Sequence, residues 1–507
     1  MQRDMGRNGI MLTRRFFIGG AASCFALGPG RIFAATGETV AAGRPELSLG
    51  VVSDIHIALD KGGKRLNRNY MTDTFKATLT RFRDAGADVV VIAGDMAHHG
   101  LGRELIAVGE AWDSVFPGGR APDGRNVERI FVTGNHDNGP ARAKRVLSDK
   151  KAIRENLIAA DYKKWWDRAF HEEWKPVFFK TVKGYQFVGF NWVIGDCRGR
   201  DENFNPEIAD WYAKNGGKID PSRPFFHIQH PHPQGTVHGP VWGQDDGMST
   251  QALMSRPNAI AFSGHSHISL TDERSVWQGG FTSIGCGSLR NVSLQAPGSC
   301  KISSGAGFEN YTTPSTAPKD ADAMKAMGIA NRFNCRQEQF LRVYSDRVLI
   351  SRREAISGES YGPDLVMPLP AAERRPFDFK MREAKAMAPE FPAGAALTVK
   401  RVKGHVRGTP GAKNRKVPVW EITIPRADAV RNARAAAYTL DIKTADGSAL
   451  ALGVIDEGFR FPAESARGKA CAVCRVACER IPKGGFTVAV RAVSCWGRSS
   501  SPIEAKV

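Results

Sequence analysis

Five short apolar runs in the first half of the chain each end directly in side chains that commonly bind metals. These runs are residues 47–52, 89–93, 130–133, 225–229 and 259–263. Apolar runs of this length and β-rich composition are typical of strands that are buried on both faces. Helical patterns at residues 71–85 and 103–115 lie between some of them. We therefore expect a layered α/β domain, in which a β-sandwich is flanked by helices.

The polar residues that follow these runs form one candidate set. It comprises Asp54, His56, Asp95, Asn135, His136, Asp137, His230, His265 and His267. Any one of them could be an ordinary turn or loop residue. In layered α/β domains, however, ligands bind at the carboxyl ends of the strands, where all five groups fall. Oxygen and imidazole ligands without thiolate suit Mn, Fe or Zn. Two metals about 3.5–4 Å apart need roughly seven protein ligands, including a carboxylate that bridges them.

The order and spacing of these residues resemble the five motifs of calcineurin-like metallophosphoesterases. The matching motifs are Asp54-x-His56, Gly94-Asp95, Gly134-Asn135-His136-Asp137, His230 and Gly264-His265-x-His267. The resemblance covers roughly residues 47–355. It divides seven ligands into a first set (Asp54, His56, His267), a second set (Asn135, His230, His265) and a bridge (Asp95). It also implies that His136 is the general acid or a contact to a substrate oxygen, oriented by Asp137.

This resemblance implies a phosphohydrolase that cleaves phosphate mono- or diesters by attack of a metal-bound hydroxide. Two divalent cations can activate a water and clamp phosphoryl oxygens, and an imidazole can protonate the leaving oxygen. Four loops are expected to select the anionic ester, namely residues 57–70, 98–102, 138–180 and 286–335. Their sequences do not indicate which ester they bind. The choice between monoester and diester therefore stays open.

Two histidine-rich segments bear on the type of metal centre and on the choice of ligand. Purple acid phosphatases carry a tyrosine three residues after the bridging aspartate, whereas this chain has His98. Iron–tyrosinate chemistry is therefore not expected, and His98 and His99 either reach the substrate or are solvated loop residues. His232 is the alternative to His230 as a metal ligand, because both lie in the same histidine-rich segment.

Residues 1–36 have the layout of an export signal. Arg14-Arg15 is followed by an apolar stretch at residues 16–27 and by the small pair Ala34-Ala35. The paired arginines resemble the twin-arginine type of signal. The alternatives are an uncleaved anchor or an ordinary secretion signal. The apolar stretch is too short and too interrupted by glycine to span a bilayer, so we expect no transmembrane segment in the mature chain. A periplasmic, extracellular or cell-surface location is predicted.

The remainder of the 507-residue chain is expected to hold two domains. Residues 45–367 would form the metallophosphoesterase domain, and the proline-rich stretch 368–395 a linker. Alternating segments separated by Gly- and Pro-bearing turns predict a small β-sandwich at residues 396–507. Its last part resembles the closing strands of fibronectin type III domains. Such a domain could contact a cell surface, and the competing function is a surface-binding or adhesion protein with a vestigial metal site.

Charge and cysteines limit the partners further. The chain has 71 Lys and Arg against 52 Asp and Glu, a formal charge of +19 that would attract anions. The basic residues are scattered, so specific nucleic-acid binding is not expected. Eight of the nine cysteines follow the predicted signal, and an oxidising compartment would favour disulfides. A metal site or disulfides are the two interpretations of Cys471, Cys474, Cys478 and Cys495, and disulfides are the interpretation we favour.

Overall fold

The computed structural model describes residues 43–507 with gaps. The gaps are residues 64–65, 67–70, 194–203, 240–241, 296, 298–334, 407–414, 428–432, 463–470 and 482–483. The chain divides into two compact units, Met1–Arg44 and Pro45–Val507. The predicted export signal lies outside the described residues. None of the helices in the described part is long and apolar enough to cross a membrane.

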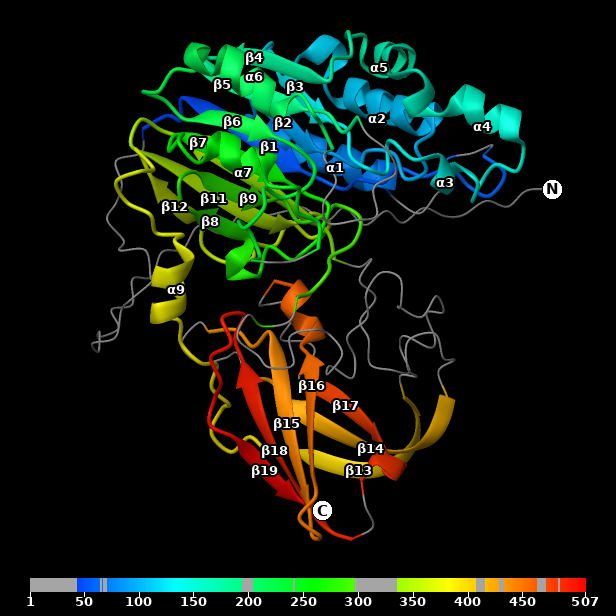
Figure 1. Cartoon of the computed structure of the whole chain (residues 1–507), viewed down its shortest axis with the longest axis vertical. Helices are drawn as coiled ribbons and strands as arrows, with labels where there is room; N and C mark the ends of the chain where they lie inside the picture. Colours follow the sequence, from blue (N-terminus) through cyan, green and yellow to red (C-terminus); the bar gives the residue numbers. More distant parts are fainter. Residues whose placement is uncertain are drawn as a thin grey trace, which may run out of the picture. The chain divides into compact units, whose positions relative to one another are not determined.

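Two mixed six-stranded sheets form the first half of the second unit (Figure 1). The first sheet has the order β12 (Leu365–Pro368), β11 (Arg347–Glu354), β10 (Gln337–Val343), β1 (Leu47–Val52), β2 (Val89–Ala93), β3 (Glu128–Val132). The second has the order β4 (Val177–Val182), β5 (Tyr185–Phe190), β6 (Phe225–Ile228), β7 (Ala259–Ser263), β9 (Thr282–Gly285), β8 (Val276–Gln278). Strands β1, β2 and β3 are parallel, as are β5, β6, β7 and β9.

The alternation of side chains along these strands builds three apolar layers. Val89 and Val91 of β2 belong to the core between the two sheets, whereas Val90 and Ile92 belong to the core beneath helices. Those helices are α1 (Met71–Asp84), α2 (Gly102–Val115) and α5 (Tyr162–Phe170). Helices α6 (Ile208–Asn215) and α7 (Met248–Leu253) pack on the outer face of the second sheet. The predicted β-sandwich flanked by helices is confirmed.

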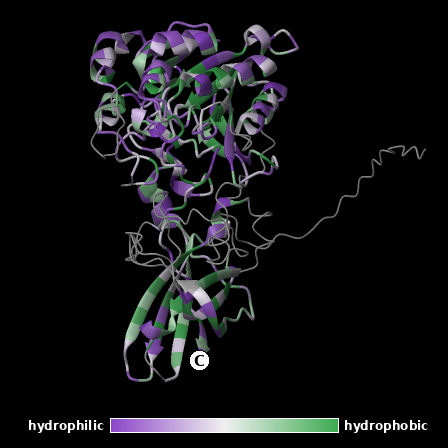
Figure 2. Ribbon diagram, turned by 90° about the vertical axis from the view of Figure 1, so that its right-hand side faces the viewer, coloured by the Kyte–Doolittle hydropathy of each residue, from purple (hydrophilic) through white to green (hydrophobic). Residues whose placement is uncertain are grey.

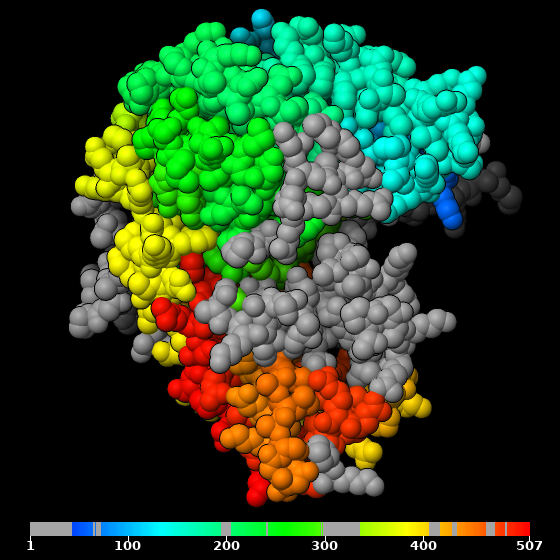
Figure 3. Space-filling model, in the orientation of Figure 1, coloured from blue at the N-terminus to red at the C-terminus, as the bar shows by residue number. Residues whose placement is uncertain are grey.

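A helical segment follows β3 in the chain, within the range 138–180 that is expected to select the ester. It contains α3 (Pro140–Ala143), α4 (Lys150–Asn156) and α5. Asp149 and Asp161 cap α4 and α5 by accepting hydrogen bonds from backbone amides of the first turn. Figure 3 shows this segment, coloured cyan, at the surface of the molecule.

Two antiparallel sheets form the C-terminal part of the unit. One has the order β13 (Thr398–Val406), β14 (Arg415–Pro425), β17 (Cys471–Ala477), and the other β16 (Ala449–Ile455), β15 (Ala437–Thr444), β18 (Phe486–Val493), β19 (Ile503–Lys506). Figure 2 shows hydrophobic and hydrophilic bands alternating along their long strands. The apolar faces share one core, which is compatible with the predicted all-β domain. The likeness to fibronectin type III domains stays a prediction, as do the domain boundaries. Helix α9 (Phe379–Lys385) lies within the predicted linker.

The preference for disulfides among the C-terminal cysteines is wrong for two of the described thiols. Cys478 and Cys495 form no disulfide. Cys474 lies on β17 and faces the core between the C-terminal sheets, whereas Cys495 packs in a separate apolar cluster with Trp496. Because these two thiols belong to different cores, they share neither a disulfide nor a metal. The side chain of Cys471, together with Cys197 and Cys300, lies outside the described residues.

A buried histidine on β6 of the second sheet predicts that the protein loses stability in acid. His227 accepts a hydrogen bond from the Tyr212 hydroxyl at Nδ1 (2.8 Å) and donates from Nε2 to Gln229 Oε1 (2.5 Å). Burial lowers the pKa of His227 from 6.5 to about 4. The unfolded chain therefore binds this proton more tightly, and stability is lost as pH falls from 6.5 through 4. The loss at this site is on the order of 3 kcal/mol.

We expect His227→Gln to reduce the loss of stability between pH 7 and pH 4 by about 2–3 kcal/mol. Glutamine keeps a donor and an acceptor but has no basic nitrogen. Urea unfolding at both pH values measures the change, with His171→Gln as an exposed control. An unchanged pH dependence in the His227 variant would show that protonation of this residue does not limit acid stability.

Candidate metal centre

All seven predicted ligands lie just beyond the carboxyl ends of strands in the two sheets. Asp54 and His56 follow β1, Asp95 follows β2, and Asn135 follows β3. From the other sheet, His230 follows β6, and His265 and His267 follow β7. Six of the seven are buried, and His267 is partly buried. The two sheets therefore contribute ligands from opposite sides of one site.

An unusual backbone conformation accompanies these positions. Eight non-glycine residues in the described part of the chain have a positive φ, and five of them are predicted ligands. These five are Asp54, His56, Asp95, His265 and His267, with φ between 52° and 68°. A left-handed conformation costs free energy for such residues and is retained where the surrounding structure, often a functional site, requires it. The left-handed conformation therefore occurs just after β1, β2 and β7.

Two glycines of the motifs allow the loops to approach one another closely. A Cβ on Gly134 would collide with Asp95 Oδ1 and its backbone nitrogen. A Cβ on Gly264 would collide with Ser53 Oγ and would lie 2.5 Å from Asp54 Oδ2. Any larger residue would therefore displace a predicted ligand. This gives a physical reason for glycine before Asn135 and before His265.

The first ligand group consists of Asp54, His56 and His267, whose ligand atoms all lie within 4.8 Å of one another. His267 Nε2 lies 2.9 Å from Asp54 Oδ1 and 3.3 Å from His56 Nε2. His267 donates from Nδ1 to the carbonyl of Asn291 (3.1 Å), so its Nε2 carries a lone pair. A lone pair and a carboxylate oxygen 2.9 Å apart repel each other unless a cation or proton lies between them.

The second group consists of Asp95, His230 and His265. His230 Nε2 lies 3.3 Å from Asp95 Oδ2 and 3.2 Å from His265 Nδ1. The Nδ1 atom of His230 donates to the carbonyl of Ala93 (2.7 Å), which turns Nε2 toward the site. Asp95 Oδ2 is also 3.6 Å from His56 Nε2. One carboxylate oxygen therefore lies between the two groups, as a bridging ligand requires.

The remaining predicted ligand, Asn135, also meets the requirement for a metal. Its Oδ1 is buried and, like Asp54 Oδ1, has no hydrogen-bond donor among the described residues. Two buried acceptors of this kind are costly without a partner, and a cation would satisfy both. The donors present are carboxylate, amide and imidazole, which fit two divalent ions of the Mn, Fe or Zn type.

Burial and mutual charge explain the titration of the centre without a cation. Burial lowers the pKa of His56 and His265 well below 6.5, which keeps these imidazoles neutral. Burial opposes protonation of His230 too, but the carboxylates of Asp95 and Asp54 outweigh it and raise the pKa of His230 to about 9. Burial would raise the pKa of Asp95, yet His230 and His136 lower it below its ordinary range. The centre attracts positive charge.

His136 lies beside this centre. Its Nε2 is 3.9 Å from Asp95 Oδ2, and its backbone amide donates to Asp95 Oδ1 (2.7 Å). Its Nδ1 donates to the carbonyl of His98 (2.9 Å). The carboxylate of Asp137 instead accepts from the backbone amides of Gly134 and Ala97, both at 2.7 Å. The expected orientation of His136 by Asp137 is therefore corrected: the His98 carbonyl makes that contact.

The alternative ligand His232 is not available to a metal. Its Nδ1 and Nε2 are each 2.6 Å from a serine hydroxyl, Ser263 Oγ and Ser266 Oγ respectively. Both nitrogens are thus used in hydrogen bonds on the far side of the β7 loop. His99 is likewise bound, through Nδ1, to Glu104 Oε1 (2.7 Å). The sequence left the roles of His98, His99 and His232 undecided. Of these three, only His98 adjoins the centre, with its Nδ1 3.4 Å from His56 Nδ1.

The sequence did not point to Arg290, Trp192 or Trp242, which also adjoin the centre. Arg290 contacts His98 through a short Nη1–Nδ1 approach. Trp192 and Trp242 contact the ring of His265. These residues lie on loops at some distance in sequence from any motif. No spacing signal would have singled them out.

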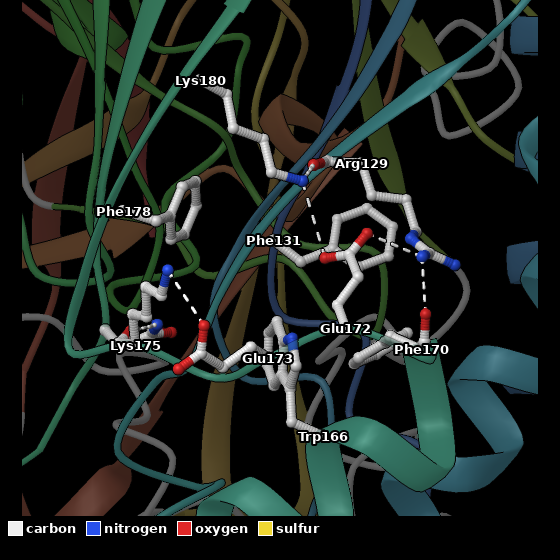
Figure 4. Close-up of a pocket in the computed structure, with 10 residues that line it drawn as sticks. Arg129, Phe131, Trp166, Phe170, Glu172, Glu173, Lys175, Phe178 and Lys180 are labelled. Carbon is white, nitrogen blue, oxygen red and sulfur yellow. Dashed lines mark hydrogen bonds and ion pairs between the residues drawn. The ribbon is translucent and has the colours of Figure 1, made fainter.

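A separate pocket lies between β3, β4 and α5, with about 380 Å³ of empty space (Figure 4). It is lined by Arg129, Phe131, Trp166, Phe170, Glu172, Glu173, Lys175, Phe178, Lys180 and Asn191. Its charges are paired with one another, as Arg129 with Glu172 (2.7 Å) and Lys175 with Glu173 (3.0 Å). The pocket includes none of the predicted metal ligands.

The chain matches one family model, and the match includes the predicted metal ligands. Residues 47–269 match the family model of the calcineurin-like phosphoesterases. No curated protein matches the chain significantly. The matched range includes all seven predicted ligands, and six of them form the two groups that could each hold a metal ion.

Solved structures resemble the chain only distantly. A dimetal phosphatase from Danio rerio is 12% identical, with a TM-score of 0.34, and the match covers 64% of this chain and 99% of that one. A purple acid phosphatase from yellow lupin (Lupinus luteus) is 12% identical, with a TM-score of 0.37 and coverage of 64% and 54%. A phosphoesterase predicted in Streptococcus pneumoniae is 12% identical, with a TM-score of 0.26 and coverage of 64% and 97%. At these TM-scores the likenesses carry no argument about this chain.

Proposed function

We propose that this protein hydrolyses phosphate mono- or diesters at a centre of two divalent cations. The observation that carries the proposal is the position of Asp95 Oδ2, 3.6 Å from His56 Nε2 in one ligand group and 3.3 Å from His230 Nε2 in the other. Asp54, His56 and His267 would hold one cation, and Asn135, His230 and His265 the other. Asp95 would be shared. Two such cations supply Lewis acidity, which neutralises phosphoryl charge and makes water a better nucleophile.

His136 is placed to serve the leaving oxygen of the ester. Its Nδ1 proton is committed to the His98 carbonyl, which fixes the ring so that Nε2 lies 3.9 Å from Asp95 Oδ2. A proton carried at Nε2 can pass to the leaving oxygen, which gains negative charge as its bond to phosphorus breaks. The ring also stacks on His98, with centroids 5.1 Å apart and planes 20° apart. Both contacts limit the motion of the imidazole.

Positive charge around the centre favours an anionic ester. Burial first, and then the charge of Arg290, lower the pKa of His98 well below 6.5. Arg142 donates to the carbonyl of Asn135 (3.2 Å) and its charge also acts on His136. Two guanidinium groups, one on α3 and one on the segment after β9, thus lie near the predicted ligands. Such charges attract phosphate groups and help to orient them.

The proposal is tested by hydrolysis of p-nitrophenyl phosphate and its bis ester, after the purified protein is stripped with a chelator and reloaded with Mn²⁺. We expect turnover of at least one ester that depends on the added metal. The ratio of the two rates decides between a phosphomonoesterase and a phosphodiesterase. If neither ester turns over while metal is bound, the competing function of a surface-binding protein with a vestigial metal site is favoured.

Export and a surface role for the C-terminal domain are further parts of the proposal. They rest on Arg14-Arg15 with the following apolar stretch, and on the likeness of the last strands to fibronectin type III domains. Cell fractionation of the native chain and of a variant with both arginines changed to lysine tests export. The variant is expected to stay in the cytoplasm, and unchanged export would contradict a twin-arginine signal.

A further inference from the structure

Trp242 is an exposed aromatic residue in direct contact with a predicted metal ligand. Its ring stacks on that of His265, with centroids 4.4 Å apart and planes 29° apart. The same His265 places Nδ1 3.2 Å from His230 Nε2, inside the second ligand group. Yet 48% of Trp242 remains exposed to solvent. Among the described residues, none of the other exposed large hydrophobic side chains stacks on a ligand of the centre.

The loop that carries Trp242 is fixed in place by backbone hydrogen bonds. His232 donates from its backbone amide to the carbonyl of Gly243 (2.8 Å), and Asp245 donates in the same way to the carbonyl of His232 (2.8 Å). Gly243 has a φ of 97°, and a Cβ there would lie 3.1 Å from the ring of His265. The loop therefore needs glycine at this point to bring its neighbour Trp242 against the histidine.

Buried polar contacts hold the next residues of the loop. The carboxylate of Asp245 accepts from the backbone amides of Gln234 (2.9 Å) and Gly247 (3.0 Å), and from the side chain of Gln229 (3.1 Å). These contacts fix the residues that directly follow Trp242 in the chain. An exposed indole stacked on a ligand is well placed to contact whatever the centre binds.

We infer that the preferred substrate is a phosphate ester that carries a flat aromatic group, an inference that rests on the proposed function. The aromatic group stacks on Trp242, and the phosphoryl group lies at the centre that contains Asp54 and Asp95. Nucleosides and aryl alcohols share this chemistry. Stacking of a base on an aromatic side chain is worth about 1–3 kcal/mol, which corresponds to roughly 5- to 150-fold in binding. Alkyl and sugar esters would lack this contribution.

Two matched substrate pairs separate stacking from other effects. Phenyl phosphate and cyclohexyl phosphate differ in the flatness of the ring, and a nucleoside 5′-monophosphate and ribose 5-phosphate differ in the base. If the protein prefers diesters, the corresponding diesters with methanol take their place. For Trp242→Ala we expect KM to rise roughly tenfold for the aromatic member of at least one pair and less than twofold for its partner. Trp242→Phe should restore most of the loss.

Binding provides a readout that does not depend on turnover. Calorimetric titration of the Mn²⁺-loaded protein with phenylphosphonate and cyclohexylphosphonate should show the same selectivity, with metal content equal in all variants. Met254→Ala, at a residue equally exposed at 48%, serves as the control and should leave both affinities unchanged. The pair that responds in the kinetic assay identifies the source of the aromatic group.

The outcomes are distinguishable. Equal losses for the aromatic and non-aromatic members, or no loss for either, would overturn this inference and leave the proposed hydrolysis intact. Loss of metal from Trp242→Ala would show that the indole supports His265 rather than the substrate, and would also overturn it. Failure of the native protein to hydrolyse any ester with metal bound would refute the proposed function itself.

Discussion

Replacing Asp95 with alanine is expected to remove both metal ions and to lower turnover by at least about a thousandfold. Its Oδ2 lies between His56 Nε2 and His230 Nε2, and its Oδ1 accepts from the backbone amide of His136. The substitution therefore removes a negative charge from both ligand groups at once. Metal analysis of the purified variant, together with its rate of ester hydrolysis, measures the effect.

The control is Asp113→Ala, which removes a carboxylate from an exposed position on α2. This variant should keep two metals and native turnover. Circular dichroism and thermal unfolding of the Asp95 variant establish whether its fold persists. If folded Asp95→Ala still holds two metals, Asp95 is not the shared ligand.

Replacing His136 with alanine is expected to leave both metals bound and to lower turnover by about 10²–10⁴-fold. His136 belongs to neither predicted ligand set, yet its ring is held beside Asp95 by the carbonyl of His98. Metal content and kcat, measured on the same preparation, separate its effect from that of a ligand. Loss of metal in this variant would show that His136 is itself a ligand.

The identity of the leaving group shows which atom His136 serves. An ester of p-nitrophenol needs little help from an acid, because its leaving oxygen is already stable as an anion, whereas an alkyl ester needs a proton. The loss of turnover in His136→Ala should therefore be much greater for the alkyl ester than for the p-nitrophenyl ester. Equal losses would place His136 on a non-bridging phosphoryl oxygen instead. His171→Ala, at an exposed position, is the matched control.

The sequence predicted the parts of the fold that depend on local patterns. The apolar runs became β1, β2, β3, β6 and β7, and the helical patterns became α1 and α2. Strand polarity then placed all seven predicted ligands just beyond the carboxyl ends of strands, and six of them form the two ligand groups. The agreement is closest where a buried strand leads straight into a metal-binding side chain, as at Asp95.

Other features depend on contacts between distant segments and could not be predicted. The left-handed backbone at Asp54, His56 and His267 follows from tertiary packing rather than from residue type. The partner of His136 Nδ1 is a backbone carbonyl, which any residue could supply, so the sequence suggested the neighbouring Asp137 instead. Cysteine spacing along the chain likewise does not reveal that Cys474 and Cys495 pack in different apolar clusters.

A titration with metal tests directly whether the centre holds two ions. Chelator-treated protein, without bound metal, is titrated with Mn²⁺ while the hydrolysis of the better p-nitrophenyl ester is followed. Hydrolysis should be absent at the start and should rise until two equivalents are bound per chain. A plateau after one equivalent, or hydrolysis that does not depend on added metal, would contradict a centre of two metals shared through Asp95.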